Sequence, residues 1–209
     1  MVSAVRPVSD FDQIAPHLAL WHGYDPAVKA DLYSTCVLTP RGAYLIDPIP
    51  LQSEALDELL GSHRVSGVIV TSSNHHRASV QFAEQFSIPV FALCETFWDK
   101  MPRQFRKVAD GDEICDELRV IGIEGGAAGE IVLHYAPGGG TLIVGDALIN
   151  FEPYGFTFLP DKYCSNEKEM RRSLRKLLDY KAERILFAHG MPILSGASDR
   201  LQALLDSDL

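Results

Sequence analysis

The first half of the chain alternates short apolar runs with stripes of apolar residues at helical spacing. The short runs are rich in β-branched residues and predict strands over residues 32–39, 43–46, 68–71 and 88–93. The stripes predict helices over residues 51–60 and 78–86, with a brief further helix over 95–100. A polar turn, residues 72–77, joins the third strand to the second helix. Such turns hold polar side chains at the end of a sheet, where α/β proteins commonly build their sites.

The second half of the chain resumes with strand signals. Apolar runs, most of them joined by glycine-rich segments, predict strands over residues 118–123, 131–135, 141–144 and 184–188. An aromatic loop over 151–158 precedes the last of them, and Asn166 with Glu169 three residues later predicts the start of a helix. Two β-rich units with helices follow one another in a chain of 209 residues. We therefore expect one domain over residues 1–209, a sheet-on-sheet sandwich with helices outside.

Composition and charge narrow the classes of partner. Hydrophobic residues make up 46% of the chain and charged residues 22%, which is typical of a soluble globular protein. The net charge of -9 argues against nucleic acid or an anionic membrane surface as the main partner, because both require a basic footprint. No apolar run approaches the roughly 20 residues that a membrane-spanning helix requires. Four widely spaced cysteines, without a leader segment, predict reduced thiols in a cytoplasmic protein.

Three of the predicted strands are followed by side chains of metal-ligand type. His75 and His76 lie in the polar turn, Asp146 follows the 141–144 strand, and His189 follows the last strand. Two histidines and one carboxylate can bind a single divalent ion such as Zn²⁺, Fe²⁺ or Mn²⁺, and can leave positions open for water. The convergence of three strand ends is more informative than any one of these residues.

At these residues the chain resembles the metallo-β-lactamase-fold superfamily, over about residues 31–189. The matching motifs are the strand ending Leu45-Ile-Asp47, the turn after Thr71, the pair Gly145-Asp146 and the pair His189-Gly190. The resemblance implies an α/β fold of the family's type, a four-layer αββα sandwich.

The polar turn departs from the pattern of that family. In the family it reads His-x-His-x-Asp-His and supplies ligands to two metal ions. The corresponding residues here are Ser72, Asn74, His76 and Arg77. A further family histidine falls in the loop that corresponds to residues 124–129, where this chain has none. The resemblance therefore implies that the usual dinuclear metal site is lost.

One hypothesis is a divergent hydrolase that binds a single metal ion through His76, Asp146 and His189. Such an ion activates water for hydrolysis. The substrate would be an ester, a thioester, a lactone or a phosphoester. Asp146 and Arg77 are then the candidate catalytic residues, with Arg77 as an anion clamp.

The same hypothesis needs residues that bind a small-molecule substrate. The candidates in the polar turn are Ser72, Asn74 and His75, and the aromatic loop adds Phe156, which we expect over the mouth of the site. Aromatic walls with a few polar groups suit the recognition of small molecules.

The other hypothesis, which the lost ligands favour, is a catalytically silent member that binds a small ligand or a protein partner and holds no metal. Arg77 would then place a fixed positive charge where the family has a ligand, and would pair with Asp146. Ser72 and Asn74 equally suit a hydrogen-bonded turn. The position of Arg77 relative to Asp146 therefore discriminates between the two hypotheses. The oligomeric state stays open.

Overall fold

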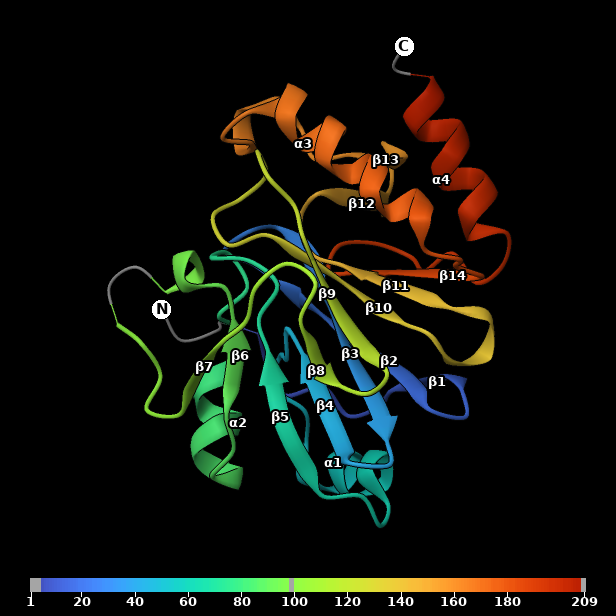
Figure 1. The fold of residues 1–209 in the computed structure, drawn as a ribbon. Coiled ribbons are helices and arrows are strands. Elements are labelled where there is room, and N and C mark those ends of the chain that lie inside the picture. The colour runs from blue at the N-terminus through green and yellow to red at the C-terminus, as the bar shows by residue number, and fades with distance from the viewer. Residues whose placement is uncertain (1–4, 98–99, 208–209) are drawn as a thin grey trace.

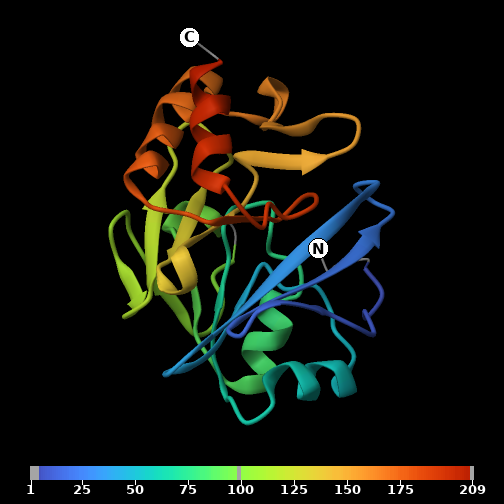
Figure 2. The same ribbon diagram turned by 90° about the vertical axis from the view of Figure 1, so that its right-hand side faces the viewer.

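Two β-sheets packed face to face form the centre of the molecule, and helices cover both outer faces (Figure 1). The computed structural model describes residues 5–97 and 100–207. Helices α1 (Ser53–Leu60) and α2 (Ser79–Phe86) pack on the sheet of the first half of the chain, whereas α3 (Glu167–Leu174) and α4 (Ala197–Asp206) pack on the sheet of the second half. Figure 2 shows these layers from the side, with the sheets between the two pairs of helices. The expected four-layer αββα sandwich is therefore confirmed.

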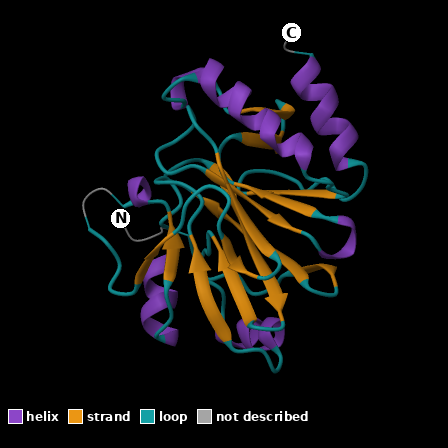
Figure 3. Cartoon of the chain, in the orientation of Figure 1, coloured by secondary structure: helices purple, strands orange, loops and turns teal. Residues whose placement is uncertain are grey.

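The described residues form three sheets and four α-helices. Figure 3 distinguishes the strands from the helices by colour. The first sheet has the order β1-β2-β3-β4-β5-β6-β7 and consists of β1 (Asp12–Ala15), β2 (Leu18–Asp25), β3 (Ala30–Thr39), β4 (Gly42–Ile46), β5 (Val65–Ile69), β6 (Val90–Ala92) and β7 (Phe105–Lys107). The second has the order β14-β11-β10-β9-β8 and consists of β8 (Glu113–Cys115), β9 (Leu118–Gly122), β10 (Ile131–Tyr135), β11 (Thr141–Val144) and β14 (Arg184–Phe187). A separate pair is formed by β12 (Leu148–Phe151) and β13 (Gly155–Phe158). The helices are α1 (Ser53–Leu60), α2 (Ser79–Phe86), α3 (Glu167–Leu174) and α4 (Ala197–Asp206), with short 3-10 helices η1 (Cys94–Thr96), η2 (Pro137–Gly139), η3 (Asp161–Tyr163) and η4 (Arg175–Asp179).

The strands predicted over residues 32–39 and 43–46 are β3 and β4, which pair antiparallel as a hairpin with Thr39 opposite Gly42. Gly42 has a φ of +121°, and a Cβ atom there would lie 2.2 Å from the Ser66 Oγ, so this turn requires glycine. From β4 to β7 the neighbouring strands are parallel. Because parallel strands end at the same edge of a sheet, β4 and β5 deliver Asp47 and Thr71 to neighbouring positions.

Apolar side chains fill the spaces on both faces of the first sheet. Along β3 and β4, Cys36 and Leu45 pack in the cluster beneath α1 and α2, whereas Val37 and Ile46 belong to the cluster between the sheets. Successive residues of a strand point to opposite faces, so both faces of these strands are buried. This double burial explains why their sequences are apolar runs with little polar alternation.

The second sheet ends at the same region of the molecule as the first. Its strands β11 and β14 are parallel, and Val144 pairs with Phe187 near the ends of both strands. Asp146 and His189, which follow these residues by two positions each, are therefore delivered side by side. The predicted start of α3 is also confirmed, because the side chain of Asn166 accepts a hydrogen bond from the Glu169 N–H at 3.2 Å.

Two segments differ from their expected form. The aromatic loop over 151–158 lies largely in a hairpin, in which β12 and β13 pair antiparallel around a turn that ends at Gly155, with a φ of +66°. The brief helix expected over 95–100 overlaps only with η1, and residues 98 and 99 lie outside the described residues. None of the helices in the described part of the chain combines the length and apolar character needed to cross a bilayer.

Candidate metal centre

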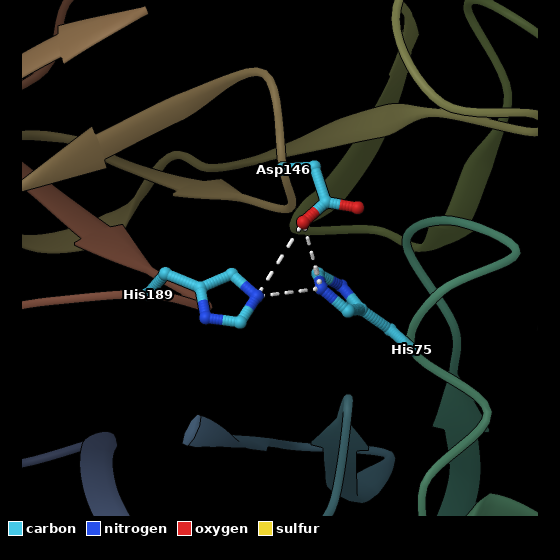
Figure 4. Close-up of side chains that lie close together, drawn as sticks. All are labelled: His75, Asp146 and His189. Atoms are coloured by element: carbon cyan, nitrogen blue, oxygen red, sulfur yellow. Dashed lines mark hydrogen bonds and ion pairs between the residues drawn. The ribbon is translucent and has the colours of Figure 1, made fainter. Parts of the chain in front are cut away.

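Three side chains from separate segments bring their donor atoms together where the strands end (Figure 4). The His75 Nε2 lies 3.1 Å from the Asp146 Oδ1 and 3.2 Å from the His189 Nε2, and the latter two atoms are 3.4 Å apart. We call these residues the His75–Asp146–His189 cluster. The side chains of His75 and Asp146 are 2% and 7% exposed, whereas that of His189 is 19% exposed. The cluster is therefore most accessible from the His189 side.

Asp47 orients the ring of His75 from the side opposite the cluster. The Asp47 Oδ2 lies 2.9 Å from the His75 Nδ1, and the Oδ1 accepts a hydrogen bond from the Thr71 N–H at 2.8 Å. The Thr71 hydroxyl also donates to the Asp47 Oδ2. A proton on the Nδ1 atom of His75 is thereby directed at the carboxylate, and the Nε2 atom faces the cluster. Carboxylates orient metal-binding histidines in this way.

Ser72 and Asn74 hold the carboxylate of Asp146. The Asp146 Oδ2 accepts hydrogen bonds from the Ser72 hydroxyl at 3.0 Å and from the Asn74 side-chain amide at 2.9 Å, while the Oδ1 faces both histidines. Burial alone would raise the pKa of Asp146. The charge of His75 and hydrogen bonds from His189 and His75 instead hold this pKa well below its usual value. Asp146 is therefore ionised at neutral pH, as a metal ligand must be.

The two histidines of the cluster differ in protonation. Burial lowers the pKa of His75, but the charges of Asp146 and Asp47 outweigh it and raise this pKa to about 9. Burial also lowers the pKa of His189, and the hydrogen bond to Asp146 only partly offsets that effect. In the metal-free protein at neutral pH, His75 thus carries two protons and His189 is neutral. A metal ion would have to displace the proton on the His75 Nε2.

His76, the ligand expected from the polar turn, does not take part in the cluster. Its Nε2 lies 2.7 Å from the Thr96 carbonyl oxygen, and its ring stacks on Phe97 with the centroids 4.3 Å apart. The group that the structure brings together therefore differs from the expected set at one position, with His75 in place of His76. The physical reason is the local backbone, since the turn directs these two adjacent side chains differently and Arg77 then adopts a φ of +38°.

Arg77 binds backbone carbonyl groups, in contrast to the expected pair with Asp146. Its Nη1 donates to the Tyr33 oxygen at 2.6 Å and to the Asp47 oxygen at 3.0 Å, and its Nη2 donates to the Ala188 oxygen at 3.3 Å. An ion pair between Arg77 and Asp146 would have argued against a bound metal, and Arg77 instead binds these backbone oxygens. The Nη1 and Nη2 atoms of Arg77 are also engaged by the protein itself, which argues against the expected anion clamp.

Phe156 lies in β13 and packs on the outer side of the second sheet. Its ring centroid is 5.7 Å from that of Phe187, and the half-buried side chain contacts the apolar cluster beneath α3 and α4. Phe156 is therefore a packing residue of this apolar cluster. Its role in binding a substrate stays a prediction.

The spacing of the three donor atoms fits one metal ion. Ligands placed tetrahedrally about Zn²⁺ at roughly 2.0 to 2.2 Å are roughly 3.3 to 3.6 Å from one another. The three distances within the cluster, 3.1, 3.2 and 3.4 Å, lie at or just below the short end of that range. Among the described residues, His75, Asp146 and His189 are the group identified as able to hold an ion. The fit rests on two neutral imidazole nitrogens and one carboxylate oxygen, a common donor set for divalent ions.

Two further buried acids surround the cluster, and the sequence did not indicate their roles. Asp47 follows β4 and Thr71 follows the neighbouring strand β5, so the position of Asp47 could have been inferred from the parallel pairing of these strands. Glu130 is 1% exposed, and its Oε1 accepts a hydrogen bond from the Ala147 N–H at 3.0 Å, next to Asp146. Burial and the charge of Asp146 raise the pKa of Glu130 well above its usual value. The only signal for it was an acidic residue at the start of an apolar run.

Comparisons with known proteins agree with this fold. The sequence comparison with curated proteins gave no significant match. DIM-1 metallo-β-lactamase is similar in structure, with a TM-score of 0.76 and 15% identity over 98% of this chain and 100% of that chain. A metallo-β-lactamase from Erythrobacter litoralis gives a TM-score of 0.73 and 14% identity over 97% of this chain and 99% of that chain. A metallo-β-lactamase family protein from Thermus thermophilus gives a TM-score of 0.67 and 20% identity over 94% of this chain and 80% of that chain.

At such low identities these structures establish the fold alone. The family itself follows from the sequence, because residues 12–208 match the family model described as the metallo-β-lactamase superfamily. The match covers the polar turn, both sheets and the segment that carries His189. The chain therefore belongs to the metallo-β-lactamase superfamily.

Proposed function

We propose that His75, Asp146 and His189 bind one divalent metal ion and that the protein is a single-metal hydrolase of an ester, a thioester, a lactone or a phosphoester. One observation carries the proposal: donor atoms from three segments lie within 3.4 Å of one another, at a spacing that suits one ion. The usual dinuclear site of the family is absent from this proposal, because Ser72, Asn74 and Arg77 stand at its positions in the turn.

The residues around the cluster would have separate roles in orienting the metal ligands. Asp47 keeps the Nε2 atom of His75 directed inward, and Ser72 and Asn74 hold the carboxylate of Asp146 so that its Oδ1 faces the histidines. When bound, a divalent ion supplies a Lewis acid that polarises the scissile group and activates water. Substrate and water would approach past His189, the most exposed of the three side chains.

A second candidate is a catalytically silent member that binds a small ligand or a protein partner without a metal. The observation that favours it is that the three donor groups already satisfy one another through contacts of 3.1 to 3.4 Å, with His75 protonated between two carboxylates. The small-molecule ligand and the cytoplasmic location stay predictions under both candidates.

Metal content tests the proposal. Protein purified without chelator and then saturated with Zn²⁺ or Mn²⁺ should hold one ion per chain by elemental analysis. His75→Ala should abolish this binding, whereas His76→Ala, a matched change at the neighbouring position, should retain it. Absence of bound metal in the wild type, or equal binding by His75→Ala, would refute the metal site. A wild type without bound metal would favour the silent candidate, whereas a loaded protein that cleaves none of a panel of esters, thioesters, lactones and phosphoesters would refute the hydrolase and leave the metal site intact.

A further inference from the structure

Arg77 is the most unusual residue near the cluster that the proposed reaction does not use. It follows the turn that carries His75, and its backbone has a φ of +38°, which is uncommon for a residue with a side chain. Its guanidinium is enclosed by the protein, and the Nε atom is buried without a hydrogen-bond partner. Burying this cation costs free energy, so the contacts that it makes require an explanation.

Its three acceptors are backbone oxygens that come from both sheets. Tyr33 lies in β3 and Asp47 follows β4, both in the first sheet, whereas Ala188 follows β14 in the second. The Ala188 oxygen also accepts a hydrogen bond from the Tyr33 N–H at 3.0 Å. The guanidinium therefore joins the strand ends of the two sheets at the point where they approach one another.

Two of these acceptors belong to residues that place the ligands. Ala188 directly precedes His189, so a bond to its carbonyl group restrains the backbone from which that side chain projects. Asp47 contacts the ring of His75 through its carboxylate while its carbonyl group accepts from Arg77. One side chain thus restrains the supports of both histidines, although its hydrogen bonds go to backbone oxygens and to neither imidazole.

We propose that Arg77 is a positioning residue, which fixes the distance between His75 on the first sheet and His189 on the second by binding the carbonyl groups of Asp47 and Ala188 at once. This inference rests on the proposed metal site. Arginine suits the task because its planar guanidinium presents several N–H groups in a fixed fork, which a lysine ammonium cannot reproduce. A small displacement of either histidine would spoil the geometry for an ion.

The test compares Arg77→Lys, which keeps the charge, and Arg77→Gln with a matched control, Arg184→Lys. Arg184 lies in β14 and also donates to a backbone oxygen, that of Gly138 at 2.8 Å, but at the other end of the strand. Zn²⁺ affinity would be measured by competition with a chromophoric chelator, and Co²⁺ would report the ligand geometry through its visible absorption. Circular dichroism would establish that each variant is folded.

Wild type and Arg184→Lys should bind Zn²⁺ alike. Folded Arg77→Lys and Arg77→Gln should bind it about 10-fold to 100-fold more weakly, with an altered Co²⁺ spectrum. A folded Arg77 variant with wild-type affinity and an unchanged spectrum would overturn the positioning role while leaving the metal site intact. If Arg77→Gln does not fold, the affinity and spectrum of Arg77→Lys decide the question. If neither variant folds, Arg77→Ala is refolded in the presence of free guanidinium. A wild-type Co²⁺ spectrum in that sample supports the positioning role of Arg77, and a spectrum that differs from the wild type overturns it. Failure of the wild type to bind Zn²⁺ would overturn the proposed function and this inference together.

Discussion

Replacement of Glu130 by glutamine should stabilise the metal-free protein, and the gain should increase with pH. Glu130 is buried behind Asp146, where burial and the charge of that carboxylate raise its pKa well above 4.5. The Oε1 atom accepts from the Ala147 N–H, and the Oε2 atom has no hydrogen-bond partner. Below its raised pKa, the folded protein holds Glu130 as a neutral acid, at a position where glutamine has nearly the same shape and no proton to lose.

The size of the effect follows from proton linkage. In the unfolded chain Glu130 releases its proton near pH 4.5, whereas in the folded protein it keeps the proton to a higher pH. Between pH 4.5 and the raised pKa, the folded state thus binds more protons than the unfolded chain, so the free energy of unfolding falls as pH rises. The slope is about 1.4 kcal/mol for each pH unit, until the pH reaches the raised pKa. Glu130→Gln removes that slope, so its advantage over the wild type should grow by the same amount.

Urea unfolding at about pH 5 and about pH 6, in the presence of a chelator, measures the effect. The control is Glu124→Gln, which alters an exposed acid on the preceding loop and should leave the pH dependence unchanged. The reasoning would be refuted if the difference between Glu130→Gln and the wild type were the same at both pH values, or if the variant lost stability as pH rose.

Three further predictions concern the neighbours of the cluster. Asp47→Asn should weaken Zn²⁺ binding about 10-fold to 100-fold in the same competition assay, because one amide oxygen cannot accept from both Thr71 and His75. In the metal-free protein, the raised pKa of His75 adds to the free energy of unfolding below pH 6.5, and this contribution is lost as pH rises through about 9. Urea titrations should show this loss of stability in the wild type and not in His75→Gln. Asn166→Ala should lower the free energy of unfolding by about 1 kcal/mol, because it removes the cap of α3. The control variant, Ser165→Ala, should be as stable as the wild type.

The parts of the fold that the sequence indicated are those in which local pattern and burial agree. The hairpin of β3 and β4 was recognisable because two apolar runs flank a compact turn with Gly42, and the start of α3 because Asn166 caps it. The aromatic segment over 151–158 was misread as a loop. Its aromatic residues concealed two short strands, although Pro153 and Gly155 in the turn between them are residues typical of a turn.

The candidate site was recognisable from its strand ends but not from its side-chain directions. Asp146 and His189 follow parallel neighbouring strands, so their convergence could be inferred. The choice between His75 and His76 depends on backbone angles within one turn, which residue types alone do not determine. The partners of Arg77 are carbonyl groups, which every residue carries, so no pattern of side chains could have indicated them.

The most direct test of the proposed metal site is an anomalous difference map from crystals grown with Zn²⁺ and measured at the zinc absorption edge. The proposed site predicts one strong peak per chain, bonded to the His75 Nε2, the Asp146 Oδ1 and the His189 Nε2 at about 2.0 to 2.2 Å. A peak bonded by His76, or a map without a peak among His75, Asp146 and His189, would contradict it.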